Sequence, residues 1–251
     1  MTREVVLSPA EETSILIEGN FDQNIYSKNL KLSLFKSLAM NTKISDEIKF
    51  MSGMSGKKYR YLINNLISLI NDARYLEIGC WAGSTVCSAL YGNQAKAVCI
   101  DNWLKFDTEE KVRKVYNTKD QKKEFETNTK KVITDKIDFK FIESDFRKVN
   151  YKQLGKFNVY CYDALHHEKD QYDGIVIAQP ALDDIFILII DDWNWTEVRQ
   201  GTLKAINDLK IKIISKIEIR TTQDNSMPKL FIGQYSDWHN GYFIAVCKKS
   251  Q

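Results

Sequence analysis

The sequence is poor in proline and glycine, with 3 and 11 of its 251 residues. Numbers this low exclude a collagen-like chain and a proline-rich linker. An excess of charge of one sign is also missing, because 36 Lys and Arg residues face 33 Asp and Glu residues, for a formal net charge of +3. So small a surplus does not favour binding driven by counterion release, and we expect no nucleic-acid partner.

Long hydrophobic runs are missing as well. The longest purely apolar run, from Ile185 to Ile190, is far shorter than the roughly 20 residues that span a bilayer. Near the N-terminus, Glu4, Glu11 and Glu12 interrupt the apolar core that a signal peptide requires. These features predict a cytoplasmic protein with no membrane partner.

The cysteines contain no C-x-x-C pair. They are Cys80, Cys87, Cys99, Cys161 and Cys247. A disulfide framework or a zinc knuckle would need closer, paired spacing. We therefore expect reduced thiols that pack as small core residues.

From residue 74 onward, short apolar runs alternate with helical patterns. The expected strands are 74–78, 96–100, 139–142, 157–162, 185–190, 211–219 and 242–246. Strands that are apolar on both faces and alternate with helices are typical of a parallel sheet covered by helices. No helix separates the last two strands, so we expect them to pair antiparallel. The sequence predicts an α/β fold, a doubly wound, mostly parallel, seven-stranded sheet with an antiparallel last strand.

Two segments flank or interrupt this pattern. We expect residues 1–71 to form an N-terminal helical cap on the substrate side, because apolar residues recur at helical spacing in 57–70. Residues 72–251 then form the ligand-binding domain. Within it, the charged stretch at about 104–137 is typical of a solvated helical face. Because it follows a strand, it is also a candidate lid over the sheet edge where such folds bind ligands.

The most informative turn joins the first expected strand to a helix, with Glu77-x-Gly79 at the strand end and Gly83 at the helix start. Glycines there let the backbone approach a ligand, and the helix N-terminus adds hydrogen-bond donors. A plain tight turn is the alternative, since a glycine-rich turn alone is a weak signal. Asp101 ends the next strand, at about the 20-residue spacing of an acidic residue that binds ribose hydroxyls.

Further acidic residues follow two later strands. Asp163 comes directly after 157–162, and Asp191 and Asp192 come after 185–190. Parallel strands bring them to one edge, where three carboxylates repel one another unless a positive group lies between them. A hard divalent cation, Mg²⁺ above all, suits such oxygen ligands. Capping of the next helix is the alternative, and it explains one of Asp191 and Asp192 but not both together with Asp163.

The glycine turn together with Asp101 resembles the class I S-adenosylmethionine-dependent methyltransferases, over about residues 72–248. The resemblance implies a Rossmann-like fold, typically six parallel strands and one reversed, with S-adenosylmethionine as cofactor. The cofactor-binding residues that it implies are Glu77, Gly79, Cys80, Trp81, Gly83, Ser84, Asp101, Asn102, Trp103, Asp145, Phe146 and Asp163.

The acidic residues after the later strands look like those of the metal-dependent O-methyltransferases of the catechol and macrolide-sugar types. This resemblance implies a divalent cation, Mg²⁺, held by Asp163, Asp191 and Asp192. It also implies that His166 is the general base, with His167 as the competing candidate. The chain departs from the pattern at Ala164, where relatives have glycine, and it lacks their Pro-Gly-Gly turn before the fifth strand.

The leading hypothesis is methyl transfer to a hydroxyl of a small molecule, with sugars among the candidates. Two alternatives stay open: a metal-independent methyltransferase of the same fold, and a catalytically inactive nucleotide-binding or assembly module. The function of the loop 238–241 before the last strand is left open, with substrate contact among the possibilities, and a homo-oligomer is left open as well. The acceptor is also undecided, because the loops that select it carry little pattern.

Overall fold

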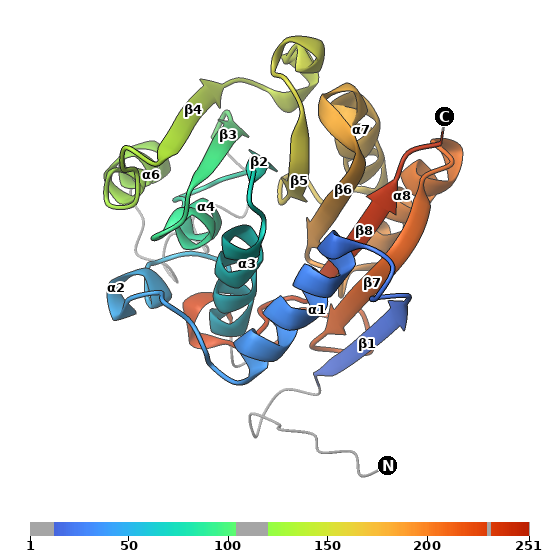
Figure 1. Cartoon of the computed structure of the whole chain (residues 1–251), viewed down its shortest axis with the longest axis horizontal. Coiled ribbons are helices and arrows are strands. Elements are labelled where there is room, and N and C mark those ends of the chain that lie inside the picture. The colour runs from blue at the N-terminus through green and yellow to red at the C-terminus, as the bar shows by residue number, and fades with distance from the viewer. Residues whose placement is uncertain (1–12, 104–119, 230–231, 251) are drawn as a thin grey trace.

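The computed structural model describes residues 13–103, 120–229 and 232–250. Within them, eight strands form one sheet in the order β1-β7-β8-β6-β5-β2-β3-β4 (Figure 1). The strands are β1 (Ser14–Gly19), β2 (Arg74–Ile78), β3 (Ala95–Asp101), β4 (Ile137–Glu143), β5 (Phe157–Tyr162), β6 (Leu182–Asp191), β7 (Lys212–Arg220) and β8 (Tyr242–Lys248). The helices are α1 (Ile25–Leu38), α2 (Asp46–Lys49), α3 (Lys57–Leu69), α4 (Ser84–Leu90), α6 (Gln121–Lys130), α7 (Glu168–Ala178) and α8 (Thr196–Asp208).

The strand pairing confirms a mostly parallel sheet with a reversed last strand. β2 pairs parallel with β3 and β5, β3 with β4, and β5 with β6. β8 lies between β6 and β7 and is antiparallel to both. The carboxyl ends of β2, β3, β5 and β6 therefore meet at one edge, as the sequence predicts.

The number of strands differs from the prediction of seven. β1 lies inside the segment predicted as a helical cap and pairs antiparallel with β7, with Ser14 opposite Arg220 and Gly19 opposite Ser215. The segment predicted as a helical cap therefore contains a strand in addition to its helices. Among the described residues β1 pairs only with β7, and its Leu16 and Ile17 side chains are exposed, unlike those of the inner strands.

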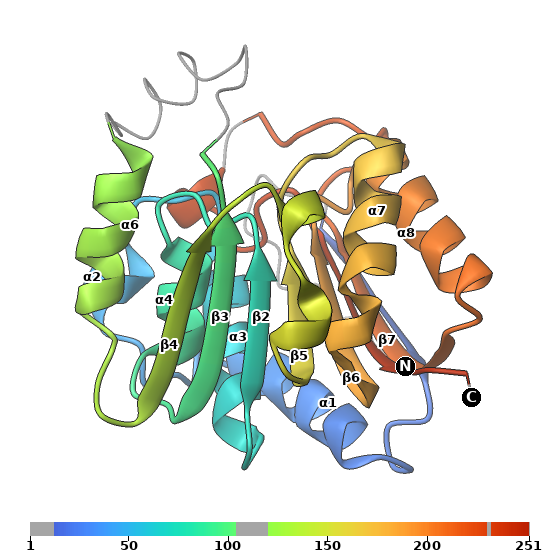
Figure 2. The same cartoon turned by 90° about the horizontal axis from the view of Figure 1, so that it is seen from above.

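Helices cover both faces of the sheet (Figure 2). Side chains of α3 and α4 pack in one hydrophobic core, and those of α7 and α8 pack in a second core on the opposite face. Successive residues of β2 alternate between the two, with Tyr75 in the first core and Leu76 in the second. This alternation is expected for a strand buried on both faces.

Three further predictions concern the cysteines, the candidate lid and membrane-spanning helices. All five cysteines are free and buried. The part of the candidate lid from 104 to 119 lies outside the described residues, whereas α6 forms within its remainder and buries Phe125. No helix in the described parts of the chain is both long enough and apolar enough to cross a membrane.

Candidate active site

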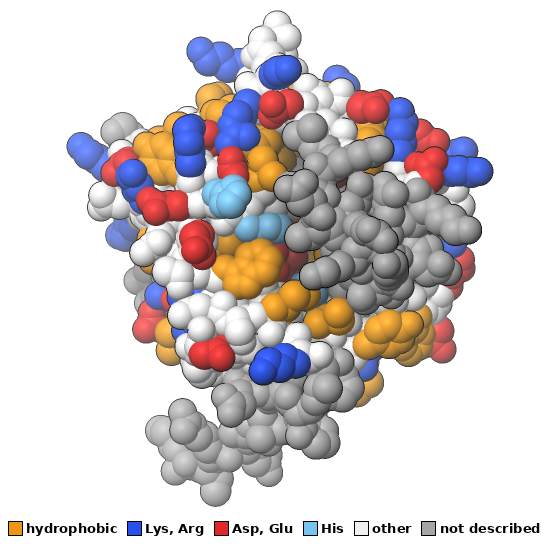
Figure 3. All heavy atoms as spheres, turned by 180° about the vertical axis from the view of Figure 1, so that it is seen from behind, with side chains coloured by type: hydrophobic (Ala, Val, Ile, Leu, Met, Phe, Trp, Pro, Cys, Tyr) orange, Lys and Arg blue, Asp and Glu red, His pale blue; other side chains and the backbone are white. Residues whose placement is uncertain are grey.

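A cavity of about 480 Å³ lies at the carboxyl edge of the sheet, lined by residues that follow β2, β3, β4, β5 and β6. Its volume falls within the range of small-molecule sites. Two of the three histidines of the chain, His166 and His239, line it. Figure 3 shows a face of the molecule on which histidine side chains lie beside hydrophobic ones.

Most of the predicted cofactor residues line this cavity. They are Gly79, Trp81, Asp101, Asn102, Trp103, Asp145, Phe146 and Asp163. Asp145 also caps the short turn after β4, because its Oδ1 accepts a hydrogen bond from the Arg147 N–H at 3.0 Å. The structure therefore brings the turn after β2 and the ends of three neighbouring strands around one space.

Four predicted cofactor residues do not line the cavity: Glu77, Cys80, Gly83 and Ser84. Glu77 is fully buried and accepts a hydrogen bond from the Tyr75 hydroxyl, and burial raises the pKa of its carboxyl to about 8. The Ser84 hydroxyl lies 3.0 Å from that of Ser55. A direct contact of these side chains with the cofactor stays a prediction.

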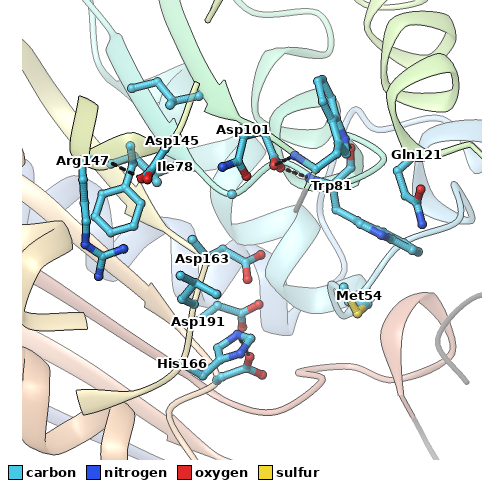
Figure 4. Close-up of a pocket in the computed structure, with 18 of the residues that line it drawn as sticks. Met54, Ile78, Trp81, Asp101, Gln121, Asp145, Arg147, Asp163, His166 and Asp191 are labelled. Carbon is cyan, nitrogen blue, oxygen red and sulfur yellow. Dashed lines mark hydrogen bonds and ion pairs between the residues drawn. The ribbon is translucent and has the colours of Figure 1, made fainter. Parts of the chain in front are cut away.

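Asp101 holds two turns of the site together (Figure 4). Its Oδ2 accepts hydrogen bonds from the N–H groups of Cys80 at 2.7 Å and Trp81 at 2.9 Å, and its Oδ1 accepts one from Trp103 at 2.8 Å. Trp81 and Trp103 have φ angles of 42° and 47°, which are uncommon for bulky residues. The Asp101 carboxylate thus stabilises a strained backbone at the cavity.

Gly79 explains how the turn after β2 comes so close to the end of β5. Its φ is 84°, and a Cβ at this position would lie 1.8 Å from the carbonyl oxygen of Asp163. Only glycine accepts both this conformation and this approach.

The acidic residues after β5 and β6 converge as predicted. Ligand atoms of Asp163, His166 and Asp192 all lie within 4.8 Å of one another. Burial and then the neighbouring carboxylates raise the pKa of Asp163 to about 7 and that of Asp191 well above its usual value. Asp163 is the carboxylate that raises the pKa of Asp191 most, and the buried Oδ1 of Asp191 has no hydrogen-bond partner among the described residues.

This arrangement suits a divalent cation, because a cation offsets the repulsion between the converging carboxylates that raises their pKa values. Helix capping does not explain the two carboxylates after β6. Trp195, not Asp191 or Asp192, occupies the N-cap position of α8, and no side chain makes a capping hydrogen bond there.

The two candidate bases lie in different environments. His166 Nε2 is 2.6 Å from Asp192 Oδ2, and its ring meets Trp195 edge-on with the ring centroids 4.8 Å apart. Burial acts to lower the pKa of His166, but the Asp192 carboxylate raises it overall. His167 is exposed at the start of α7 and does not line the cavity. The geometry therefore favours His166, whose role as base stays a prediction.

Comparison with known proteins identifies the fold. No protein-family model matches the chain, and no curated protein is significantly similar to it in sequence. The O-methyltransferase TomG of Streptomyces achromogenes, involved in tomaymycin synthesis and crystallised with S-adenosylmethionine, has a similar structure. It is 11% identical, with 90% of this chain and 100% of that chain covered and a TM-score of 0.55. A candidate RNA methyltransferase from Pyrococcus horikoshii is 12% identical, with 88% and 98% covered and a TM-score of 0.50.

The chain has the class I methyltransferase fold. At these identities the likeness concerns the fold alone. In this methyltransferase fold, sequence reasoning missed His239 and Asn240. His239 lines the cavity, and Asn240 donates a hydrogen bond to Asp192 Oδ1 at 2.8 Å. The signal available was a third histidine in an unassigned loop. The position of that loop depends on the insertion of β8 between β6 and β7, which no local pattern shows.

Proposed function

We propose that this protein transfers the methyl group of S-adenosylmethionine to a hydroxyl of a small molecule. The observation that carries the proposal is that one cavity holds two groups of polar residues. Asp101 and Asp145 lie at one end, and Asp163 and His166 lie towards the other (Figure 4), where Asp192 lies close to both. A cofactor bound at the first end can present its methyl group to an acceptor at the second. That TomG, an O-methyltransferase, shares the fold adds support.

The cofactor end combines carboxylates with a fixed aromatic ring. The Asp101 carboxylate can accept hydrogen bonds from the ribose hydroxyls, and the Phe146 ring can pack against a face of the adenine. The Arg147 guanidinium lies 4.4 Å from the Phe146 ring centroid. Asp170 and Asp173 hold that guanidinium, so the aromatic ring is supported by a cation–π contact before any ligand binds.

Asp163, Asp191 and Asp192 are the residues that would hold the divalent cation. Once bound, such an ion would act as a Lewis acid and lower the pKa of an alcohol or phenol. His166 then accepts the proton of the acceptor hydroxyl while the oxygen forms its bond to the methyl carbon. The bond from that carbon to sulfur breaks at the same time, its electron pair stays on sulfur, and S-adenosylhomocysteine leaves. Asp192 orients the imidazole for this transfer and stabilises its charged form.

A second candidate is methyl transfer without a metal. It is favoured by the 2.6 Å contact of His166 Nε2 with Asp192 Oδ2. A histidine and an orienting carboxylate form a general base without a cation. In this case protonation, and not a cation, relieves the repulsion between the Asp163 and Asp191 carboxylates.

Two measurements test these proposals. Calorimetry with S-adenosylhomocysteine tests cofactor binding, and the absence of binding to folded protein would reject methyl transfer and leave the nucleotide-binding or assembly module. Transfer of a radiolabelled methyl group is then measured on phenolic and sugar hydroxyl compounds, before and after chelation. Activity that is lost on chelation and restored by Mg²⁺ supports the metal proposal, whereas full activity in metal-free enzyme supports the second candidate.

A further inference from the structure

The loop Trp238–Gly241 reaches the acidic cluster through Asn240. Asn240 is fully buried, and its Nδ2 donates a hydrogen bond to Asp192 Oδ1 at 2.8 Å. Its Oδ1 accepts a hydrogen bond from Asn194 Nδ2 at 3.0 Å. Since each end of the amide meets a different partner, the side chain has one favourable orientation.

Asn194 is itself held firmly. Its Oδ1 accepts a hydrogen bond from the Thr221 backbone N–H at 3.0 Å, and its Nδ2 also donates to Thr221 Oγ1 at 2.8 Å. The Asn194 backbone N–H donates to the Asn240 carbonyl oxygen at 3.0 Å. A buried polar network therefore runs from the end of β7 through the segment after β6 to the loop before β8. A fully satisfied network of this kind is rigid.

The two oxygens of Asp192 consequently face different groups. Oδ1 is bound by the Asn240 amide, and Oδ2 points to His166. The φ of Asp192 is 56°, in the left-handed region that few residues other than glycine adopt readily. Its orientation therefore depends on side-chain contacts more than on backbone preference.

We propose that Asn240 is a positioning residue of the cation site: its amide binds one oxygen of Asp192 and so presents the other to a divalent cation and to His166. This inference rests on the metal-assisted form of the proposed function. Hydrogen-bonding partners of metal ligands typically contribute 10–100-fold to metal affinity, and loss of the Asn240 amide should weaken cation binding by a factor in this range.

The test is a calorimetric titration of Mn²⁺ into the full chain in the presence of S-adenosylhomocysteine. Asn240→Ala should bind Mn²⁺ about 10–100-fold more weakly than the unmodified protein. Its affinity for S-adenosylhomocysteine, measured separately, should stay within about twofold, because Asn240 does not line the cavity. Asn240→Ser, whose hydroxyl is too short to replace the amide, takes its place if the alanine variant does not fold.

Thr221→Val is the matched control. Thr221 belongs to the same buried network, but its hydrogen bonds go to Asn194 and His239 and not to Asp192. The valine variant should lower the melting temperature, as the Asn240 variants do, while its Mn²⁺ affinity stays within about twofold. A purely structural role of Asn240 would make the two kinds of variant alike.

Three results would overturn the inference: unchanged Mn²⁺ affinity in the Asn240 variants, an equal loss in Thr221→Val, or no Mn²⁺ binding to the unmodified protein. In the last case, binding of S-adenosylhomocysteine separates two failures. Protein that binds S-adenosylhomocysteine but not Mn²⁺ retains the metal-free candidate, and protein that binds neither loses the proposed function as well.

Discussion

His239 should make the protein sensitive to acid, and His239→Asn should remove that sensitivity. The imidazole is buried, and its Nδ1 accepts a hydrogen bond from the Gly233 backbone N–H at 2.9 Å. An asparagine Oδ1 can accept the same hydrogen bond, and asparagine tolerates the φ of 44° found at this position. The substitution therefore removes the titrating group while keeping its anchor.

The size of the expected change in unfolding free energy follows from the pKa of His239. Burial lowers it from 6.5 to about 4, against the opposing effect of the Asp192 carboxylate. Between these pH values the unfolded chain binds a proton that the folded protein does not, so acid favours unfolding. At 1.36 kcal/mol for each pKa unit, this group contributes about 3 kcal/mol of stability. The contribution is fully present above the unfolded pKa and is lost as the pH falls through that value towards the folded pKa.

The assay is equilibrium unfolding in urea, carried out on both proteins at a series of pH values through this acid range. Other titrating groups act in both proteins, so the difference between the two unfolding free energies isolates His239. That difference should change by about 3 kcal/mol across the range, with the unmodified protein losing stability faster. Unfolding free energies that change with pH by the same amount in both proteins would refute the reasoning. Titration of His239 by NMR should independently place its midpoint well below the usual value for histidine.

Four further substitutions test the site. His166→Gln should lower turnover by about 10²–10⁴-fold in steady-state assays while His167→Gln retains most activity, and the reverse order would move the base to His167. The glutamine amide can still donate a hydrogen bond to Asp192, so if His166 is the base and not a ligand, calorimetry should find the Mn²⁺ affinity of His166→Gln changed by no more than a few-fold. Asp101→Ala should lose on the order of 1–3 kcal/mol of binding to S-adenosylhomocysteine by calorimetry, and unchanged affinity would remove Asp101 from the site. Gly79→Ala should melt well below the unmodified protein, because its Cβ would lie 1.8 Å from the Asp163 carbonyl oxygen, and an unchanged melting temperature would contradict this packing.

The parts of the fold that follow from the sequence are those with a local pattern. Inner strands such as β5 are buried on both faces, so they appear as continuous apolar runs. Because parallel strands end at one edge, the convergence of Asp163 with Asp192 could be predicted from their positions after two such runs. The strand β1 could not be predicted, because its apolar run of Ile15, Leu16 and Ile17 is too short to distinguish a strand from a helix.

Contacts that depend on distant pairing or on strand pleat were harder to predict. Asn240 reaches Asp192 only because β8 lies between β6 and β7. Glu77 belongs to the predicted turn, but its side chain lies on the same face of β2 as Tyr75 and meets that residue instead of the cavity. Alternation along the strand could have separated Glu77 from Ile78, which does line the cavity.

The strand order also has a consequence for how the chain folds during synthesis. β8 leaves the ribosome after both of its neighbours, and β7 pairs on its other side with β1, whose Ser14 lies opposite Arg220. Until β8 emerges, β6 and β7 have no strand between them, and contacts between such distant segments are slow to form. The β2–β3–β5 half of the sheet can assemble earlier, so the Asn240–Asp192 contact should be among the last to form. A nascent or truncated chain would therefore expose unpaired strand edges next to an incomplete site, a state prone to aggregation.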